Sequence, residues 1–318
     1  MSDLTDAVRT KAQDLVESGE VKLVIGHARG TAPYRAQPFF AASAADVEKL
    51  ICDVSCAANL AAYVAKPSEK MAVIAKGCDA RSLMVLTSEG QAARENLLII
   101  GVACAGRLDE GRLLAKLDFP PREVKSVREE GGEVVVEGLA GDVRLPRDEV
   151  VMPACSWCRV RTPAVCDVML GDALPPRDEA DTYADLAALD AMTEAQRAAF
   201  WHEQLGKCIR CYACRNACPS CFCPDCFVDC FQPQWALRGG GQFGGNWIWN
   251  LGRAQHLAGR CAACGNCERV CPVGIPLMLV NRWMERETKR QFNHLAGMSA
   301  EQKQLAALFR KGEVAVDR

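Results

Sequence analysis

Two short cysteine runs constrain this chain more than any other feature of its sequence. Residues 208–219 and 261–272 each read Cys-x-x-Cys-x-x-Cys-x-x-x-Cys-Pro. Three thiols two residues apart on one turning loop can reach three corners of an iron–sulfur cube, and proline then turns the chain away. Two complete copies of the run therefore predict two 4Fe-4S clusters.

The fourth cysteine of each run is expected to bind the cluster of the other run, as in two-cluster ferredoxins, which these runs resemble. One cluster would be held by Cys208, Cys211, Cys214 and Cys271. The other would be held by Cys261, Cys264, Cys267 and Cys218. The alternative is a pair of zinc ribbons, but zinc knuckles need neither a third cysteine nor the Cys-Pro step.

Composition and charge narrow the choice of partner and of cellular compartment for this chain. The chain has 318 residues, 19 of them cysteine, and a formal net charge of −2. Such a charge does not favour a nucleic-acid partner. The N-terminus lacks the apolar core of a secretory signal, and no apolar run is long enough to cross a membrane. We therefore expect a cytoplasmic protein without direct membrane insertion, which partner subunits could attach to a membrane complex.

The first 175 residues have the pattern of an α/β domain with a mostly parallel sheet. Apolar spacing predicts helices over residues 3–18, 42–64 and 81–94, with Ser43 as an N-cap of the second. Short apolar runs predict strands over residues 21–26, 71–77, 96–104, 133–138 and 148–155.

The second half is expected to be helical. Its pattern predicts a linker at 176–195, a two-cluster domain at 196–295 and a terminal helix at 296–318, with a glycine loop at 237–246. Residues 195–292 resemble the all-helical dicluster ferredoxin domain of respiratory and heterodisulfide-reductase-type subunits. That resemblance implies two neighbouring clusters that conduct electrons.

Four more cysteines follow the first run within ten residues. They are Cys221, Cys223, Cys226 and Cys230. They could hold a further metal, tune the nearby cluster, exchange with Cys218 as a ligand, or fill apolar space. His256, five residues before the second run, could lie near a cluster or at the surface.

Cysteines also follow the predicted strands of the first half. Cys78, Cys104 and Cys155 each come at or just after a strand end, and Cys158 lies close by. Parallel strands bring their carboxyl ends to one edge of a sheet, so four thiols could meet there around a third cluster. Cys52 and Cys56 are four positions apart, and we expect them to pack in the core from one face of a helix.

The segments KGCDARSL, GVACAGRLD and PACSWC…CDVMLGD resemble the beta subunit of deazaflavin-dependent hydrogenases and formate dehydrogenases. The resemblance covers about residues 20–175. It implies a flavin and one 4Fe-4S cluster, with Cys78, Cys104, Cys155 and Cys158 as the ligands. Cys166 would be an alternative ligand or a filler.

Two departures from that family concern the flavin and the order of the domains. The ferredoxin domain follows the α/β domain here, whereas it normally precedes it, and the family's N-terminal Gly-Gly segment is missing. The residues left for an anion-binding turn, and so for FAD, are Gly26, Arg29, Gly30 and Thr31.

These features predict an electron-relay subunit of an anaerobic redox complex. Its partners would be heterodisulfide-reductase-like, flavin-containing, or formate dehydrogenase- and hydrogenase-like subunits. The alternatives are a flavoenzyme subunit that exchanges hydride with a nicotinamide or deazaflavin, and a zinc-loaded interaction protein without redox activity.

Overall fold

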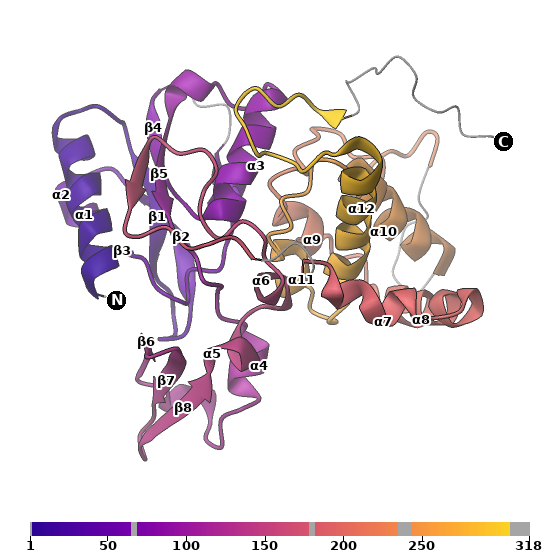
Figure 1. Cartoon of the computed structure of the whole chain (residues 1–318), viewed down its shortest axis with the longest axis horizontal. Helices are drawn as coiled ribbons and strands as arrows, with labels where there is room; N and C mark the ends of the chain where they lie inside the picture. The colour runs from indigo at the N-terminus through magenta and orange to yellow at the C-terminus, as the bar shows by residue number, and fades with distance from the viewer. Residues whose placement is uncertain (1, 65–68, 178–181, 235–242, 306–318) are drawn as a thin grey trace.

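The computed structural model describes residues 2–64, 69–177, 182–234 and 243–305, and it contains an α/β part followed by a helical part (Figure 1). The main sheet has the order β2-β1-β4-β5-β9, with β3 also paired to β1. Its strands are β1 (Val24–Arg29), β2 (Ala36–Ala41), β3 (Leu50–Ile51), β4 (Met71–Ala75), β5 (Leu97–Val102) and β9 (Val168–Leu170). Strands β1, β4, β5 and β9 run parallel, and β2 and β3 run antiparallel to β1. The prediction of a mostly parallel sheet is confirmed.

Both faces of this sheet are covered by helices. Helix α1 (Ser2–Glu17) packs Val8, Ala12 and Leu15 on one face, and α3 (Gly77–Ser88) packs Leu83 and Met84 on the other. Successive strand residues point to opposite faces, so the central strands are apolar along their whole length. This arrangement leaves the carboxyl ends of β4 and β5 side by side.

A second, antiparallel sheet lies apart from the first (Figure 1). It consists of β6 (Ser126–Glu130), β7 (Glu133–Glu137) and β8 (Asp142–Pro146), and it packs beside α4 (Glu110–Leu114). The predicted strand at 133–138 is β7, but the predicted strand at 148–155 is wrong. That segment forms α5 (Arg147–Val150) and α6 (Pro153–Ser156), because Pro153 occupies the first helical position, where its missing N–H costs nothing.

The predicted helix at 42–64 is also wrong over most of its length. Ser43 does cap a helix, accepting a hydrogen bond from the Asp46 N–H, but this helix is only α2 (Ala44–Val47). The Asp53 carboxylate then accepts hydrogen bonds from the N–H and hydroxyl of Ser55. Such a local bond offers the backbone an alternative to the helix, and the chain continues as a loop to η1 (Leu60–Tyr63). Cys52 and Cys56 therefore lie in this loop.

The helical part is built on three longer helices that pack around cysteine loops. These are α8 (Glu194–Gly206), α10 (Phe243–His256) and α12 (Leu277–Phe292). Its shorter turns of helix are η4 (Ala184–Leu186), α7 (Ala187–Asp190), α9 (Ala213–Asn216) and α11 (Asn266–Arg269). The α/β part has two more, η2 (Arg94–Asn96) and η3 (Pro121–Glu123). Most of the glycine loop expected at 237–246 and most of the expected terminal helix lie outside the described residues.

The two parts meet at a buried junction. Arg81 of α3 donates hydrogen bonds to the carbonyl oxygens of Ala296 (2.7 Å) and Ala262 (3.2 Å). Gly297 has a φ of +71°, and a Cβ there would lie 2.0 Å from the Arg81 carbonyl oxygen, so only glycine allows this approach. The contact fixes the cysteine loops of the helical part against the sheet. Within the described residues, no helix has the length and apolarity required to cross a bilayer.

Candidate metal centres

The two cysteine runs fold into loops of the same backbone shape. The second residue after the first cysteine is left-handed in both loops (Arg210, φ 58°; Ala263, φ 52°). So is the fourth residue after it (Tyr212, φ 58°; Gly265, φ 75°). Each loop then enters a short helix, α9 or α11. A left-handed non-glycine residue costs about 1–2 kcal/mol, so the repetition indicates that both loops hold their thiols in one specific geometry.

Cysteines of both runs surround Cys214. Burial is the main cause that raises the pKa of Cys214 to about 11. The Arg253 guanidinium opposes this rise, and the neighbouring thiolates of Cys267, Cys208 and Cys271 contribute to it. Cys208 and Cys214 are buried and Cys211 is exposed. The structure thus brings Cys271 of the second run close to the cysteines of the first.

Cysteines of both runs also surround Cys261. Burial raises its pKa well above the usual value, and the thiolates of Cys264, Cys218 and Cys267 add to that effect. Cys218 comes from the first run and lies among three cysteines of the second. Asn266 donates a hydrogen bond to the Ala217 carbonyl oxygen (2.8 Å), which ties the two loops together beside this group.

One buried cation lies between the two groups. Arg253 of α10 is 4% exposed and donates a hydrogen bond to the Cys214 carbonyl oxygen (3.2 Å). Burial by itself lowers its pKa, but nearby thiolates raise the pKa well above the usual value overall. The thiolates are those of Cys267, Cys218, Cys221 and Cys214. A fixed positive charge here offsets the negative charge that clustered thiolates carry.

A third cysteine group lines a cavity of about 420 Å³ at the sheet edge. Its thiols are those of Cys78, Cys104, Cys155 and Cys158. Cys78 lies in the first turn of α3 after β4, Cys104 follows β5, and Cys155 is on α6. A Cβ on Gly77 would lie 2.1 Å from the Val160 carbonyl oxygen, so glycine lets the Cys158 loop approach α3. Cys264 of the helical part lines the same cavity.

Two buried cations line this third cavity. Lys76 pairs with Asp79 (2.8 Å) and also donates to the Ala58 carbonyl oxygen. Burial lowers the pKa of Arg107, but the thiolates of Cys104, Cys52 and Cys56 raise it overall. Positive charge beside four thiols suits an anionic cluster, so these residues fit a 4Fe-4S group.

Comparison with known proteins finds two families that match successive parts of the chain. Residues 68–199 match the family described as the C terminus of the beta subunit of coenzyme F420 hydrogenase/dehydrogenase. Residues 204–275 match the family described as 4Fe-4S dicluster domain. The chain is thus similar to this beta-subunit family over residues 68–199 and to dicluster domains over residues 204–275. It is an iron–sulfur electron-transfer protein.

Beta subunits are also among its relatives. The F420-dependent formate dehydrogenase subunit beta of Methanocaldococcus jannaschii is 22% identical over 350 residues, covering 92% of this chain and 91% of the relative. The F420-dependent formate dehydrogenase 1 subunit beta of Methanococcus maripaludis is 23% identical over 281 residues, covering 69% and 73%. Because alignments keep residue order, the first relative aligns with both domains in the order seen here.

Among solved structures, a chain of the xenon-derivatised F420-reducing [NiFe] hydrogenase complex from Methanosarcina barkeri is similar to this chain. The TM-score is 0.41 and the identity 14%, with 58% of this chain and 72% of that chain covered.

The turn expected to hold FAD in the beta-subunit domain does not form a cradle. Gly26 is packed inside the sheet, where a Cβ would meet side-chain atoms of Leu50 at 2.7 Å and Ile74 at 2.8 Å. The Arg29 guanidinium already pairs with Asp53 (2.5 Å). Gly30 and Thr31 line only an open surface hollow with Arg29. These residues do not fit a flavin.

The remaining cysteines lie outside these groups. Cys52 and Cys56 are buried, and burial raises the pKa of Cys56 to about 12. Cys166 packs against Gly101 and does not line the third cavity. Cys221, Cys223 and Cys226 line a separate cavity, whereas Cys230 donates to the Cys226 carbonyl oxygen (3.6 Å). The buried cations Lys76, Arg107 and Arg253 were missed from the sequence, although Lys76 adjoins the KGCD segment.

Proposed function

We propose that this chain is the electron-relay subunit of a redox complex of the formate dehydrogenase or hydrogenase kind, and that it carries three 4Fe-4S clusters. The ligands would be Cys208, Cys211, Cys214 and Cys271 for the first cluster, Cys261, Cys264, Cys267 and Cys218 for the second, and Cys78, Cys104, Cys155 and Cys158 for the third. The beta-subunit domain would span residues 1–175 and the dicluster domain 196–295, joined by a linker at 176–195.

The position of Cys264 carries this proposal. It belongs to the second cysteine group and also lines the cavity of the third. A cluster in that cavity would therefore be a direct neighbour of the second cluster. Arg253 lies against thiols of both the first and second groups, so these two would also be neighbours. The three clusters would form one continuous path.

The surroundings of the path suit electron transfer. Cys208, Cys214 and Cys267 are buried, which keeps water from the clusters, and the exposed Cys211 brings the first cluster toward the surface. Ile209 beside it is 56% exposed and offers an apolar contact for a partner. The clusters supply one-electron chemistry, and the protein supplies their spacing and electrostatic environment.

The names of the relatives support a partner of the formate dehydrogenase kind, and the partner at the other end is a further part of the proposal. A catalytic subunit of formate dehydrogenase or hydrogenase type would exchange electrons with one end of the path, and a flavin-containing or heterodisulfide-reductase-like subunit with the other. None of the 19 cysteines forms a disulfide. Free thiols in this number favour a reducing, cytoplasmic setting.

The test is cluster content after anaerobic purification. The Cys155→Ala/Cys158→Ala variant should lose about four iron and four sulfide per chain relative to the unaltered chain. Cys166→Ala is the matched control and should lose none. Unchanged iron in the double variant would remove the third cluster from the path. About one bound flavin per chain would instead favour a flavoenzyme subunit that exchanges hydride.

A further inference from the structure

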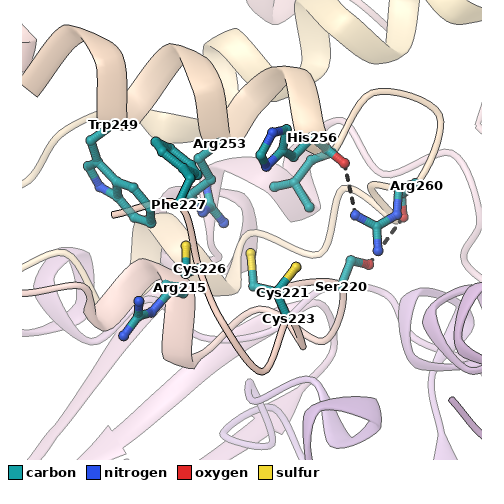
Figure 2. Close-up of a pocket in the computed structure, with 11 residues that line it drawn as sticks. Arg215, Ser220, Cys221, Cys223, Cys226, Phe227, Trp249, Arg253, His256 and Arg260 are labelled. Carbon is teal, nitrogen blue, oxygen red and sulfur yellow. Dashed lines mark hydrogen bonds between the residues drawn. The ribbon is translucent and has the colours of Figure 1, made fainter. Parts of the chain in front are cut away.

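A cavity in the helical part belongs to none of the three cysteine groups. It lies between the segment 220–227 and helix α10, with about 390 Å³ of empty space. Three thiols and one imidazole line it: Cys221, Cys223, Cys226 and His256. Figure 2 shows the three sulfur atoms pointing toward α10, the helix that carries His256 and Arg253. Four side chains of metal-binding type thus surround one space.

The charges around this cavity favour an anionic occupant. Three guanidinium groups line it, those of Arg215, Arg253 and Arg260. Arg215 pairs with Asp229 and Arg260 with Glu89. Arg253 is only 4% exposed, and its Nε has no hydrogen-bond partner among the described residues. A buried donor normally has an acceptor, and the thiols of Cys218, Cys221 and Cys267, to which the Arg253 guanidinium is hydrogen-bonded, supply acceptors to this group.

The spacing of the thiols indicates a group larger than one metal ion. In the described part of the chain, no three His, Cys, Asp or Glu side chains lie close enough together to hold a single ion. The two ferredoxin loops also lack such a close group of three side chains, because the thiolates that bind a cubane lie at separate corners of it. A tetrahedral zinc site does not fit this arrangement.

We propose that Cys221, Cys223, Cys226 and His256 bind a further iron–sulfur cluster of the 4Fe-4S class. Imidazole is an established ligand of iron–sulfur centres, in place of thiolate. Cys230 is excluded because its thiol bonds to the Cys226 carbonyl oxygen and does not line the cavity. The Cys221 N–H donates a hydrogen bond to the carbonyl oxygen of Cys218 (3.1 Å), a ligand proposed for the second cluster, so this cluster would adjoin the second one.

The first test is the metal content of the full chain, reconstituted anaerobically with ferrous iron and sulfide. Cys223→Ala/Cys226→Ala should lose about four iron and four sulfide per chain and keep the electron paramagnetic resonance signals of the other clusters. Cys230→Ala is the matched control and should lose none. Unchanged iron in the double variant, a loss of zinc in place of iron, or an equal loss in Cys230→Ala would overturn the proposal.

The imidazole is tested separately. His256→Ala should lower the iron content of this cluster, and His256→Cys should restore it, because thiolate can take the same corner. Equal iron in His256→Ala and the unaltered chain would overturn the role of His256.

The unaltered chain offers a test that requires no variant to fold. Cys223 is exposed, so as a free thiol it would react with iodoacetamide. As a ligand it should stay unmodified in the iron-loaded protein and react only after a chelator removes the iron, as peptide mass spectrometry would report. Alkylation of Cys223 in fully loaded protein would overturn the proposal. This outcome is independent of the three-cluster relay, which uses none of these residues.

Discussion

Arg81 of α3 and Glu285 of α12 form an ion pair of 3.1 Å across the junction of the two domains, with side chains only 4% and 7% exposed. The pair joins the helix that follows β4 to the helix that follows the second cysteine run. Replacing Arg81 leaves the buried Glu285 carboxylate with only its longer contact to Arg282 (3.4 Å) and removes the hydrogen bonds to the Ala262 and Ala296 carbonyl oxygens. Arg81→Met should therefore destabilise the loaded chain by about 3–5 kcal/mol in anaerobic urea unfolding.

A surface pair provides the control for that measurement. Lys116 and Glu149 are paired at 2.5 Å, but their side chains are 46% and 45% exposed. Lys116→Met should cost about 0–1 kcal/mol, because solvent screens the pair. Equal losses from the two substitutions would contradict the buried role of Arg81.

Arg253 should raise the reduction potentials of the dicluster domain. Its buried charge lies beside thiols of both cysteine groups, and a positive charge stabilises the more negative, reduced form of a cluster. Arg253→Gln should therefore shift the potentials to lower values in a titration followed by electron paramagnetic resonance. Arg253→Lys should restore part of the shift. Arg286→Gln, on the outer side of α12 where Arg286 pairs with Asp190, should leave the potentials unchanged.

Lys76 should be required for the third cluster because it supplies positive charge to the cavity of Cys78. Lys76→Met should lower iron by about four per chain, and it also leaves the buried Asp79 unpaired. The double variant Lys76→Met/Asp79→Leu removes both charges and should recover stability without recovering iron. Full iron content in the double variant would show that the Lys76 charge is dispensable for the cluster.

Gly77 should tolerate no side chain. A Cβ there would lie 2.1 Å from the Val160 carbonyl oxygen, and moving that backbone displaces the neighbouring Cys158. Gly77→Ala should therefore lose the iron of the third cluster, about four per chain by iron analysis. Gly206→Ala is the control, since nothing lies within 4 Å of the added atom. Normal iron in Gly77→Ala would mean that the loop can relax without loss of the ligand.

The parts of the fold that follow from strong local patterns could be predicted from the sequence. Runs such as residues 97–102, which are apolar at nearly every position, identified the buried parallel strands, and cysteine spacing identified the dicluster domain. The second sheet was largely missed because β6 and β8 carry several charged residues and are partly exposed, so their alternation is weak. The prediction of one helix over residues 42–64 was wrong because the Asp53 carboxylate organises a turn that apolar spacing does not reveal.

The charges of the site depend on tertiary contacts. Arg253 appears in the sequence as one polar residue of an amphipathic helix, and only the packing of α10 against the cysteine loops makes it a buried cation. The cavity beside it likewise requires residues from both 220–227 and α10. No short sequence motif contains both of these segments, so the cavity could not be predicted from the sequence.

The proposed exchange of Cys218 and Cys271 between the two loops affects how the clusters of this protein would be lost on exposure to oxygen. In the proposed ligand sets each loop supplies one cysteine to the cluster of the other loop, so loss of one cluster would release a cysteine from the loop that holds the other. Oxygen reaching the exposed Cys211 would attack the outermost cluster first. The damage would then spread inward, and the domain would fail as a whole. A subunit that has lost only one of these two clusters and still occupies its place in a complex would not accumulate.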